Sequence, residues 1–544
     1  MKRTAISTLA FAALVCPAGA AVVISSGATN HMNCSGGVCT PTAKNSVLNA
    51  SDLQGMLASG DVSVSTGAGA VSIAVSAPLT WASTSRLTLS ADNGVSIKAA
   101  VVVEGTGAMT LAPSGGALNF YPGGSIAFWD NSSSLVISGN AYTLVSDIAT
   151  LASDVQGNPA GFYALAKDYD ASGDSFSDAA VPATLTGTFE GLGHTISNFS
   201  IDSFDSFDLG LFAEIDGTAR DLDMSGGDIG CDLDNSGAAA GLLVGENKGT
   251  LKNIAVAGRI SCARARDVGG VAGDNTAPGT IANATSAINI PQSKAHNAGG
   301  LVGVNTGTIQ KSSASGNIEG ANAGGLVGST TGTVTDSHAT ASVLNDHGYG
   351  LGGLAGTASG TILRCSASGN VRGNKQTGGL VGSASFLTID SSFATGTATS
   401  VHQGGGLIGV ADNHVTLTNS YARGAASGSS AKGYAGGLVG WSQSPVSAAT
   451  SYSTGAPSGG KYTGGSIGDV TGSVAIADVY WDLDTSGVSD PGKGAGNSAG
   501  YPGIAGLTTA QFQSGLPAGF DPSIWAESAS VNNGYPYLIA NPPQ

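Results

Sequence analysis

The pentapeptide Gly-Gly-Leu-Val-Gly recurs along the chain, and its spacing is the feature that most restricts the fold. It begins at Gly299 and again at Gly324, 25 residues later. Counting variants, ten copies follow one another at steps of 25 to 31 residues, from a degenerate copy at Leu209 to the last one at Gly464. Self-similarity at such a period indicates a solenoid, in which each repeat forms one coil.

The residues between the copies favour short strands over helices. Each repeat contains brief apolar pieces separated by Gly, Asn and Ser, without a helical stripe of about ten residues. The chain holds 85 glycines among 544 residues, and each glycine inside a helix costs about 1 kcal/mol relative to alanine. The sequence therefore predicts an all-β fold, a parallel β-helix whose strands pair with the same strand of the next coil about 4.8 Å away.

The repeat and its flanks divide the chain into segments. Residues 61–146 alternate apolar and polar side chains without the pentapeptide, which predicts shorter coils. Short helices are expected within Ser46–Gly60 and Asp147–Gly157, at an end or a junction. The predicted segments are a signal peptide (1–20), an N-terminal segment and cap (21–60), N-terminal coils (61–146), a junction with a short helix and an acidic loop (147–183), the repeat β-helix (184–475) and a C-terminal closing segment (476–544).

Charge and hydropathy set limits on location and partners. Lys2, Arg3, an apolar run and a small-residue site at Ala18-Gly19-Ala20 are typical of a cleaved signal peptide, so we expect a secreted or cell-surface protein. No later run of about 18 apolar residues predicts a membrane helix. The net charge of -16 argues against nucleic acid as a partner, because phosphate binding depends on Lys and Arg.

The cysteines of an exported chain favour disulfides. Cys34 and Cys39 are expected to close a small loop, with a metal-binding pair as the alternative. Cys231 and Cys262 lie 31 residues apart, the same step as the matching repeat positions, so we expect them on adjacent coils and bridged, with two free thiols as the alternative. Strand parity places Cys365 inside the coil as a buried free thiol.

Aligned copies also bring aromatic residues to one position. Phe393, Tyr421, Tyr452 and Tyr480 share the column that Ser313, His338 and Ser366 occupy in earlier copies. Strand alternation points this column outward. It is either a contact surface for sugar rings or protein side chains, or, as we favour, a stabilising stack beneath a C-terminal cover.

Motifs for catalysis or metal binding are weak. His-Glu-x-x-His is absent, and no Gly-x-Ser-x-Gly lies between a strand and a helix. Asp168, Asp170, Ser172 and Asp174 resemble the start of a calcium loop, but Ala179 stands where a Glu should be. Ordinary acidic turns are favoured here and at Asp482–Asp490, so no catalytic residue, metal or cofactor is assigned.

Several phrases together resemble filamentous-haemagglutinin-like surface adhesins of Gram-negative bacteria that carry the GLUG motif. They include "VSIAVSAPLTW", "FYALAKDYDASG", "GTFEGLGHTISNFSI", the Gly-Gly-Leu-Val-Gly series, "VYWDLDTSG" and "NNGYPYL". The resemblance implies a right-handed β-helix, outer-membrane export machinery and an adhesive role. GLUG repeats also occur in some immunoglobulin-cleaving peptidases, and the resemblance does not imply their activity.

The sequence therefore predicts a non-catalytic adhesin. It would attach through many shallow contacts to glycans or matrix proteins of a host or neighbouring cell. The alternatives are a carbohydrate-active β-helix enzyme of the polysaccharide lyase or hydrolase kind, and a passive structural component of a biofilm or surface layer.

Overall fold

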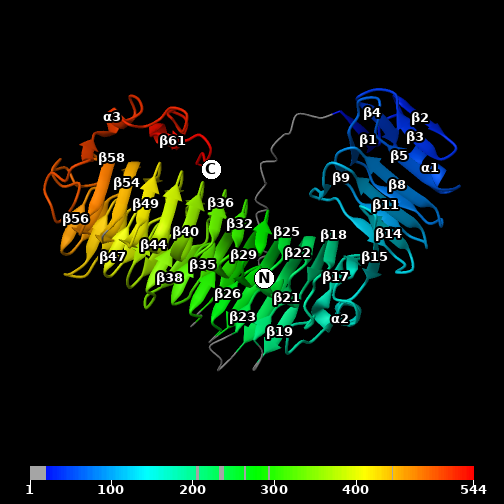
Figure 1. The fold of residues 1–544 in the computed structure, drawn as a ribbon, viewed down its shortest axis with the longest axis horizontal. Helices are drawn as coiled ribbons and strands as arrows, with labels where there is room; N and C mark the ends of the chain where they lie inside the picture. Colours follow the sequence, from blue (N-terminus) through cyan, green and yellow to red (C-terminus); the bar gives the residue numbers. More distant parts are fainter. Residues whose placement is uncertain are drawn as a thin grey trace, which may run out of the picture. The chain divides into compact units, whose positions relative to one another are not determined.

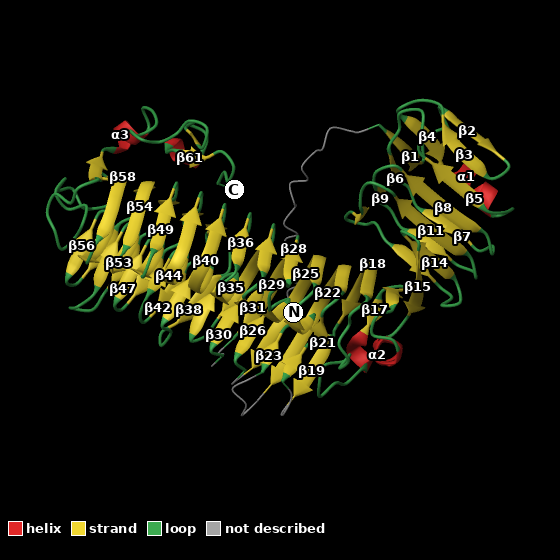
Figure 2. Cartoon of the chain, in the orientation of Figure 1, coloured by secondary structure: helices red, strands yellow, loops and turns green. Residues whose placement is uncertain are grey.

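The computed structural model describes residues 20–203, 207–231, 238–262, 265–291, 295–443 and 445–543. Residues 1–19 of the predicted signal peptide therefore lie outside the described part. The chain divides into two units, Met1–Leu144 and Val145–Gln544. Both are built almost entirely of strands (Figure 1 and Figure 2). Among the described residues, no helix is long and apolar enough to cross a membrane.

The first unit is a stack of short parallel coils. One sheet has the order β12 (Leu118–Phe120), β9 (Val95–Ile97), β6 (Ser72–Val75), β1 (Ala21–Ser25) and β4 (Ser46–Asn49). A second has the order β13 (Ile126–Phe128), β10 (Val101–Val103) and β7 (Leu79–Trp81). A third face joins in parallel β5 (Val62–Ser65), β8 (Arg86–Ala91), β11 (Ala108–Pro113) and β14 (Ser134–Ile137).

Coils begin earlier than the sequence predicted. Strand β1 already pairs with β4 and β6, inside the segment assigned to an N-terminal cap. These strands lack the pentapeptide but keep the apolar alternation that buries Val22 and Ile24. Two antiparallel pairs flank the coils, β2 (Met32–Ser35) with β3 (Val38–Pro41), and β14 with β15 (Asn140–Val145).

Both expected helices are present. Helix α1 spans Ala50–Leu57 and α2 spans Ile148–Gly157. Each starts at a side chain that accepts hydrogen bonds from first-turn N–H groups, Asn49 for α1 and Asp147 for α2. One apolar face of each helix is buried. In α1 this face includes Leu53 and Leu57.

The second unit is a parallel β-solenoid whose coils follow the pentapeptide repeat. One strand from each of the ten copies joins a 10-stranded sheet, in chain order throughout. Its members are β20 (Asp208–Leu209), β23 (Ala239–Ala240), β26 (Asp267–Gly269), β30 (Asn297–Gly299), β34 (Asn322–Gly324), β39 (Gly350–Gly352), β43 (Thr377–Gly378), β47 (Gln403–Gly405), β52 (Tyr434–Gly436) and β56 (Tyr462–Gly464). The predicted coil register is confirmed.

Further strands complete each coil. The strands following the pentapeptide are β21 (Phe212–Ile215), β24 (Val244–Asn247), β27 (Ala272–Asn275), β31 (Val302–Asn305), β35 (Val327–Thr330), β40 (Ala355–Leu363), β44 (Val381–Asp390), β48 (Ile408–Asp412), β53 (Val439–Gln443) and β57 (Ile467–Thr471). The next face comprises β16 (Phe162–Leu165), β17 (Tyr169–Asp170), β18 (Thr188–Ser197), β22 (Thr218–Cys231), β25 (Thr250–Cys262), β28 (Thr280–Ala282), β32 (Thr308–Gln310), β36 (Thr333–Thr335), β49 (Val415–Thr418), β54 (Val446–Ser453) and β58 (Val474–Asp482).

A return face closes each coil. Its strands are β19 (Ser200–Ser203), β29 (Thr285–Ile290), β33 (Ser313–Ile318), β37 (His338–Ala339), β38 (Ser342–Asn345), β41 (Ser366–Ala367), β42 (Val371–Gly373), β45 (Phe393–Ala394), β46 (Ala398–Ser400), β50 (Tyr421–Ala422), β51 (Ala426–Gly428) and β55 (Pro457–Gly459). The stack continues past the predicted boundary at residue 475, because β58 pairs with β54 and with β59 (Ile504–Leu507).

The pentapeptide forms a tight corner of each coil. A Cβ at Gly299 would overlap the carbonyl oxygen of Val302, and one at Gly300 would overlap that of Gly325 in the next coil. Leu301 and Val302 are fully buried in the coil interior, where such a pair contributes roughly 3 to 5 kcal/mol before entropy is subtracted. The glycines allow close approach, and the Leu-Val pair supplies the core.

Candidate functional site

The predicted aromatic column exists, and Phe393, Tyr421 and Tyr452 within it form a stack. Phe393, Tyr421, Tyr452 and Tyr480 pair in register on successive coils. Ring centroids are 4.8 Å apart between Phe393 and Tyr421 and 5.1 Å apart between Tyr421 and Tyr452, with interplanar angles of 4° and 6°. Their neighbour Ala422 is buried inside the coil, so the rings leave the coil on its outer side.

The outward direction does not expose these rings. Phe393, Tyr421, Tyr452 and Tyr480 are only 4%, 0%, 0% and 8% exposed. Residues 508–543, here the C-terminal strap, fold back over them; the strap contains α3 (Thr509–Phe512), β60 (Trp525–Ala526) and β61 (Tyr537–Leu538). Its buried apolar side chains are Phe512, Phe520, Trp525, Tyr535 and Leu538. The four rings are thus not an exposed contact surface, and the alternative of a stack beneath a C-terminal cover describes the structure.

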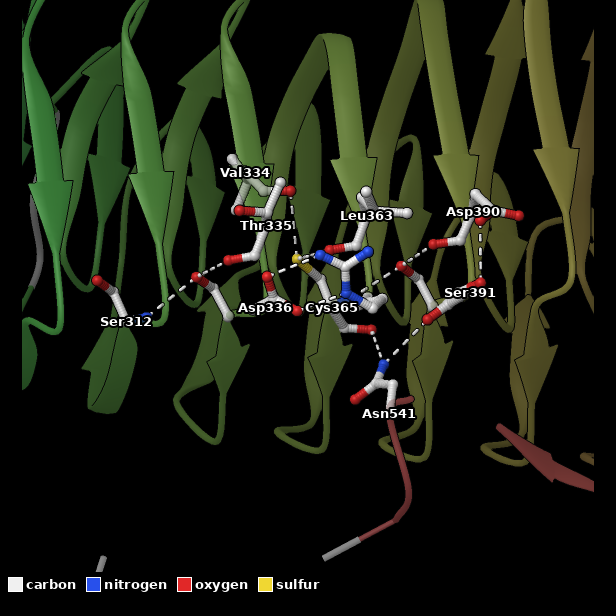
Figure 3. Close-up of polar contacts among 12 residues, drawn as sticks. Ser312, Val334, Thr335, Asp336, Leu363, Cys365, Asp390, Ser391 and Asn541 are labelled. Carbon is white, nitrogen blue, oxygen red and sulfur yellow. Dashed lines mark hydrogen bonds and ion pairs between the residues drawn. The ribbon is translucent and has the colours of Figure 1, made fainter. Parts of the chain in front are cut away.

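Hydrogen bonds fix the strap to the solenoid. The Tyr452 hydroxyl donates to the carbonyl oxygen of Pro536 at 2.6 Å and accepts from Asn532 Nδ2 at 2.9 Å. Asn541 Nδ2 donates to the carbonyl oxygens of Cys365 and Ser391, both at 3.1 Å (Figure 3). Burial raises the pKa of Tyr452 well above its ordinary value, so its hydroxyl remains protonated and able to donate.

Asp482, which the sequence placed in an acidic turn, is a buried anchor for the strap. Its Oδ2 accepts from the Tyr535 hydroxyl at 2.6 Å and from Thr509 Oγ1 at 2.7 Å. Its Oδ1 accepts from the N–H groups of Asp484 and Thr485 at 2.8 and 3.1 Å. A buried carboxylate with this many donors is satisfied; its role is to hold the strap.

The acidic stretch after Lys167 distributes its carboxylates among separate partners. Asp168 Oδ1 lies 3.0 Å from His194 Nδ1, a contact that lowers the pKa of Asp168. Asp170 accepts from the Ser172 N–H at 3.0 Å, and Asp174 accepts from the Tyr169 hydroxyl at 2.8 Å. In the described part of the chain, no three His, Cys, Asp or Glu side chains converge as metal ligands do.

A buried cluster of ionisable side chains lies in the first coils of this unit, and no sequence motif predicted it. Glu190 is fully buried, and its Oε2 lies 2.6 Å from Arg220 Nε. Asp221, also buried, accepts from Asn253 Nδ2 at 2.7 Å. Burial, with the charge of Asp221, raises the pKa of Glu190 to about 8. Because Glu190 and Asp221 are both buried, they are not accessible to a substrate in solvent, and Arg220 links Glu190 to the next coil.

Both expected disulfides are present. Cys34 pairs with Cys39 across a tight turn. Cys231 of β22 pairs with Cys262 of β25, and the Cα atoms of these two cysteines are 4.4 Å apart. Cys365 is a buried free thiol, as parity predicted, and burial raises its pKa to about 12. A thiol held protonated in this way is unreactive as a nucleophile.

A partly exposed aromatic group was missed by the sequence analysis. Tyr434 and Tyr462 stack with centroids 5.9 Å apart at 13°, and Trp441 lies 5.8 Å from Tyr434. Lys461 Nζ sits 4.7 Å from the Tyr462 ring centroid. We call Tyr434, Trp441, Lys461 and Tyr462 the aromatic–lysine patch. The signal was available, since each tyrosine stands two residues before its Gly-Gly pair, in "YAGGLVG" and "YTGGSIG".

Two shallow grooves lie along the described surface of the second unit. The larger has a volume of about 590 Å³, and its lining includes Thr188, Thr218, Asp216 and Lys248. The smaller has a volume of about 380 Å³ and is lined in part by Asp202, Asp228 and Arg259. Neither groove brings three carboxylates together.

Comparison with known proteins adds a motif and a relative. Residues 294–319 match the family described as the GLUG motif. Over 137 residues, 24% of this chain, the sequence is 33% identical to halomucin of Haloquadratum walsbyi (strain DSM 16790 / HBSQ001), and the match spans about 1% of that protein's length.

A solved structure also aligns along much of the chain. It is a protein from Bacteroides ovatus proposed to be an immunoglobulin A1 protease, with 16% identity, 74% of this chain and 93% of that chain covered, and a TM-score of 0.25. A score this low carries no inference. Geometry and motif together describe a parallel β-solenoid that carries the GLUG motif in its fourth pentapeptide coil.

Proposed function

We propose that the protein is an exported, non-catalytic surface protein that attaches to glycans or matrix proteins of another cell through many shallow contacts. The observation that carries the proposal is a regular outer face that repeats from coil to coil. One threonine per coil stands in register on this face: Thr188, Thr218, Thr250, Thr280, Thr308, Thr333, Thr361, Thr388 and Thr416.

These threonines are exposed or half-buried, and the strand spacing of about 4.8 Å sets their separation. Identical polar groups at a short fixed spacing bind a repetitive ligand weakly at each point, and the contacts together supply avidity. The GLUG motif and the similarity to halomucin support a surface-associated role, and the resemblance to haemagglutinin-like adhesins supports attachment. Export through outer-membrane machinery is part of the same proposal.

The burial of Glu190, Asp221 and Asp482 supports the non-catalytic assignment over a polysaccharide lyase or hydrolase. Hydrolysis of a sugar bond uses two carboxyl groups that face the same substrate. Glu190 and Asp221 are close to one another but buried, and Asp482 is buried beneath the strap.

Binding and turnover should be measured on one preparation. Residues 21–544 would be applied to a panel of immobilised glycans and matrix proteins, and the release of reducing sugar would be followed in parallel. Binding without sugar release is the expected result. Sugar release, or the absence of binding to every surface and to whole cells, would contradict the proposal.

A further inference from the structure

We propose that the aromatic–lysine patch binds an acidic polysaccharide, with sugar rings against Trp441 and the tyrosines and a sugar carboxylate on Lys461. The inference rests on the proposed function and names a ligand class and a site for it. The patch belongs to β52, β53, β56 and the residue preceding β56, on adjacent coils.

The aromatic side chains form a partly exposed group held by their own contacts. Tyr434 and Tyr462 pair in register and stack nearly parallel, and Trp441 is tilted by 52° against Tyr434. Trp441 Nε1 donates to Thr471 Oγ1 at 3.0 Å, which fixes the indole. Such rings present polarised faces and edges to a ligand, and the C–H groups on one side of a pyranose ring match a negative ring face.

The patch carries an exposed lysine although the chain as a whole is acidic. The chain carries a net charge of -16, yet this edge bears Lys375, Lys432 and Lys461. In the described residues none of these three lysines forms an ion pair with a carboxylate within 4.0 Å, whereas Lys248, Arg364 and Arg372 do. Lys461 lies over Tyr434 and Tyr462, at 5.7 and 4.7 Å from their centroids. The rings orient the ammonium. One carboxyl group lies beside the patch: Asp469 pairs in register with Trp441, and burial raises its pKa while the charge of Lys461 opposes that rise.

The same combination recurs along the edge. Lys375 Nζ lies 4.8 Å from the ring centroid of Tyr349, which is 54% exposed. Tyr349 adjoins β39, three strands from β52 in the 10-stranded sheet, which places it about 14 Å along the solenoid from Tyr434. A linear chain with a charged group on many of its units can contact both positions, which favours a polymer over a single sugar.

Other occupants fit less well. The C-terminal strap is engaged elsewhere, because α3 and β61 lie along the upper edge of this unit while β47 and β56 lie along its lower edge (Figure 1). A nucleic acid requires several phosphate contacts, and the surrounding negative charge opposes them. An acidic polysaccharide with one carboxylate per sugar has fewer charges per unit length than duplex DNA, and its ring faces are open to contact, whereas the bases of a duplex are stacked on one another.

The test is the binding of residues 21–544 to polygalacturonate, with dextran of equal length as the neutral polymer, at low and high salt. We expect tighter binding to polygalacturonate and weaker binding as salt rises. Trp441→Ala with Tyr462→Ala should lower the affinity about tenfold or more. Lys461→Gln should lower it about two- to fivefold, as expected for one exposed ion pair.

Phe386→Ala is the matched control. Phe386 is 64% exposed and stacks on His414, outside the 10-stranded sheet, so its removal should leave binding unchanged. Lys461 is exposed, so its substitution keeps the fold intact even where the double aromatic substitution does not. Equal affinity of wild type and Lys461→Gln, equal affinity for dextran, or an equal loss in Phe386→Ala would overturn the proposal.

The result separates the two proposals. If the patch variants retain full attachment to cells and panel glycans, the site assignment is wrong and the adhesive function stands. If wild type binds no surface at all, the adhesive function itself is wrong.

Discussion

Two tyrosines in the covered stack differ in the partners of their hydroxyl groups, which makes them a pair for measuring how hydrogen bonds hold the strap. Tyr452 and Tyr421 are both fully buried and lie on adjacent coils. The Tyr452 hydroxyl bonds to Pro536 and Asn532, whereas the Tyr421 hydroxyl has no hydrogen-bond partner among the described residues. We therefore expect Tyr452→Phe to loosen the strap and Tyr421→Phe to leave it unchanged or tighten it.

The expected size follows from the contacts that each substitution removes. Tyr452→Phe deletes one buried hydrogen bond to a carbonyl and one acceptor of the Asn532 amide, which still donates to Pro536 at 2.8 Å. A loss of about 1 to 2 kcal/mol results. Tyr421→Phe removes a buried hydroxyl that has no protein partner, so its effect lies between zero and a gain of about 1 kcal/mol.

Hydrogen exchange of the strap amides measures this difference directly, because a segment at the surface opens without global unfolding. One to two kcal/mol corresponds to a rise of about five- to thirtyfold in the opening equilibrium. We expect that rise across residues 508–543 for Tyr452→Phe, with no change in β31 as the internal control. Equal exchange in the two variants would show that the polar anchors do not hold the strap.

Three further predictions concern groups inside the coils. Cys365→Ser should be at least as stable as wild type, whereas Cys365→Ala should lose about 1 to 3 kcal/mol, because the Ser337 N–H loses its acceptor; equal melting of the two variants would contradict this. The pKa of Glu190 is about 8 in the folded protein and ordinarily 4.5, so protonation of Glu190 stabilises the fold fully below pH 4.5, and this stabilisation is lost as the pH rises through 8. Glu190→Gln should remove this pH-dependent loss of stability. If the melting temperatures of wild type and Glu190→Gln changed in parallel from pH 6 to 9, this prediction would be wrong. Replacing both Cys231 and Cys262 by Ser opens a link across 31 residues and should cost about 2 to 4 kcal/mol in denaturant unfolding, and an unchanged midpoint would refute the estimate.

The coil register could be predicted from the sequence because a repeat carries its own alignment. Once each copy was matched to the next, as Gly299 to Gly324, the pairing of equivalent positions followed, including Cys231 with Cys262 and Tyr421 with Tyr452. Strand parity then correctly placed Cys365 inside. These inferences succeed because parallel stacking makes neighbouring coils equivalent.

Contacts made by non-repeated segments could not be predicted in this way. Parity gives the direction in which Tyr452 leaves its coil, but what covers that side is decided by a strap whose sequence contains no repeat. The buried Glu190 has the same origin, since a single acidic residue in "GTFEG" gives no sign that Arg220 of the next coil will meet it. The aromatic–lysine patch could have been predicted by aligning the tyrosines before the Gly-Gly pairs, but only the Phe393 to Tyr480 column was aligned.

Polar ladders inside the solenoid explain why coils of similar apolar pattern stack in a single register. In one ladder each serine hydroxyl accepts from an N–H of the preceding coil and donates to a carbonyl of its own coil, as Ser337 does with Ser312 and Thr335. A buried asparagine ladder runs beside the pentapeptide corner, where Asn247 donates to Asn275 at 2.7 Å and Asn275 to Asn305 at 2.6 Å. Apolar columns of Leu and Val tolerate a slipped pairing, because they have no directional contacts. A slip would leave these buried amides and hydroxyls unpaired, at a cost of about 1 to 3 kcal/mol for each group, so the ladders select the register while the apolar columns supply the stability.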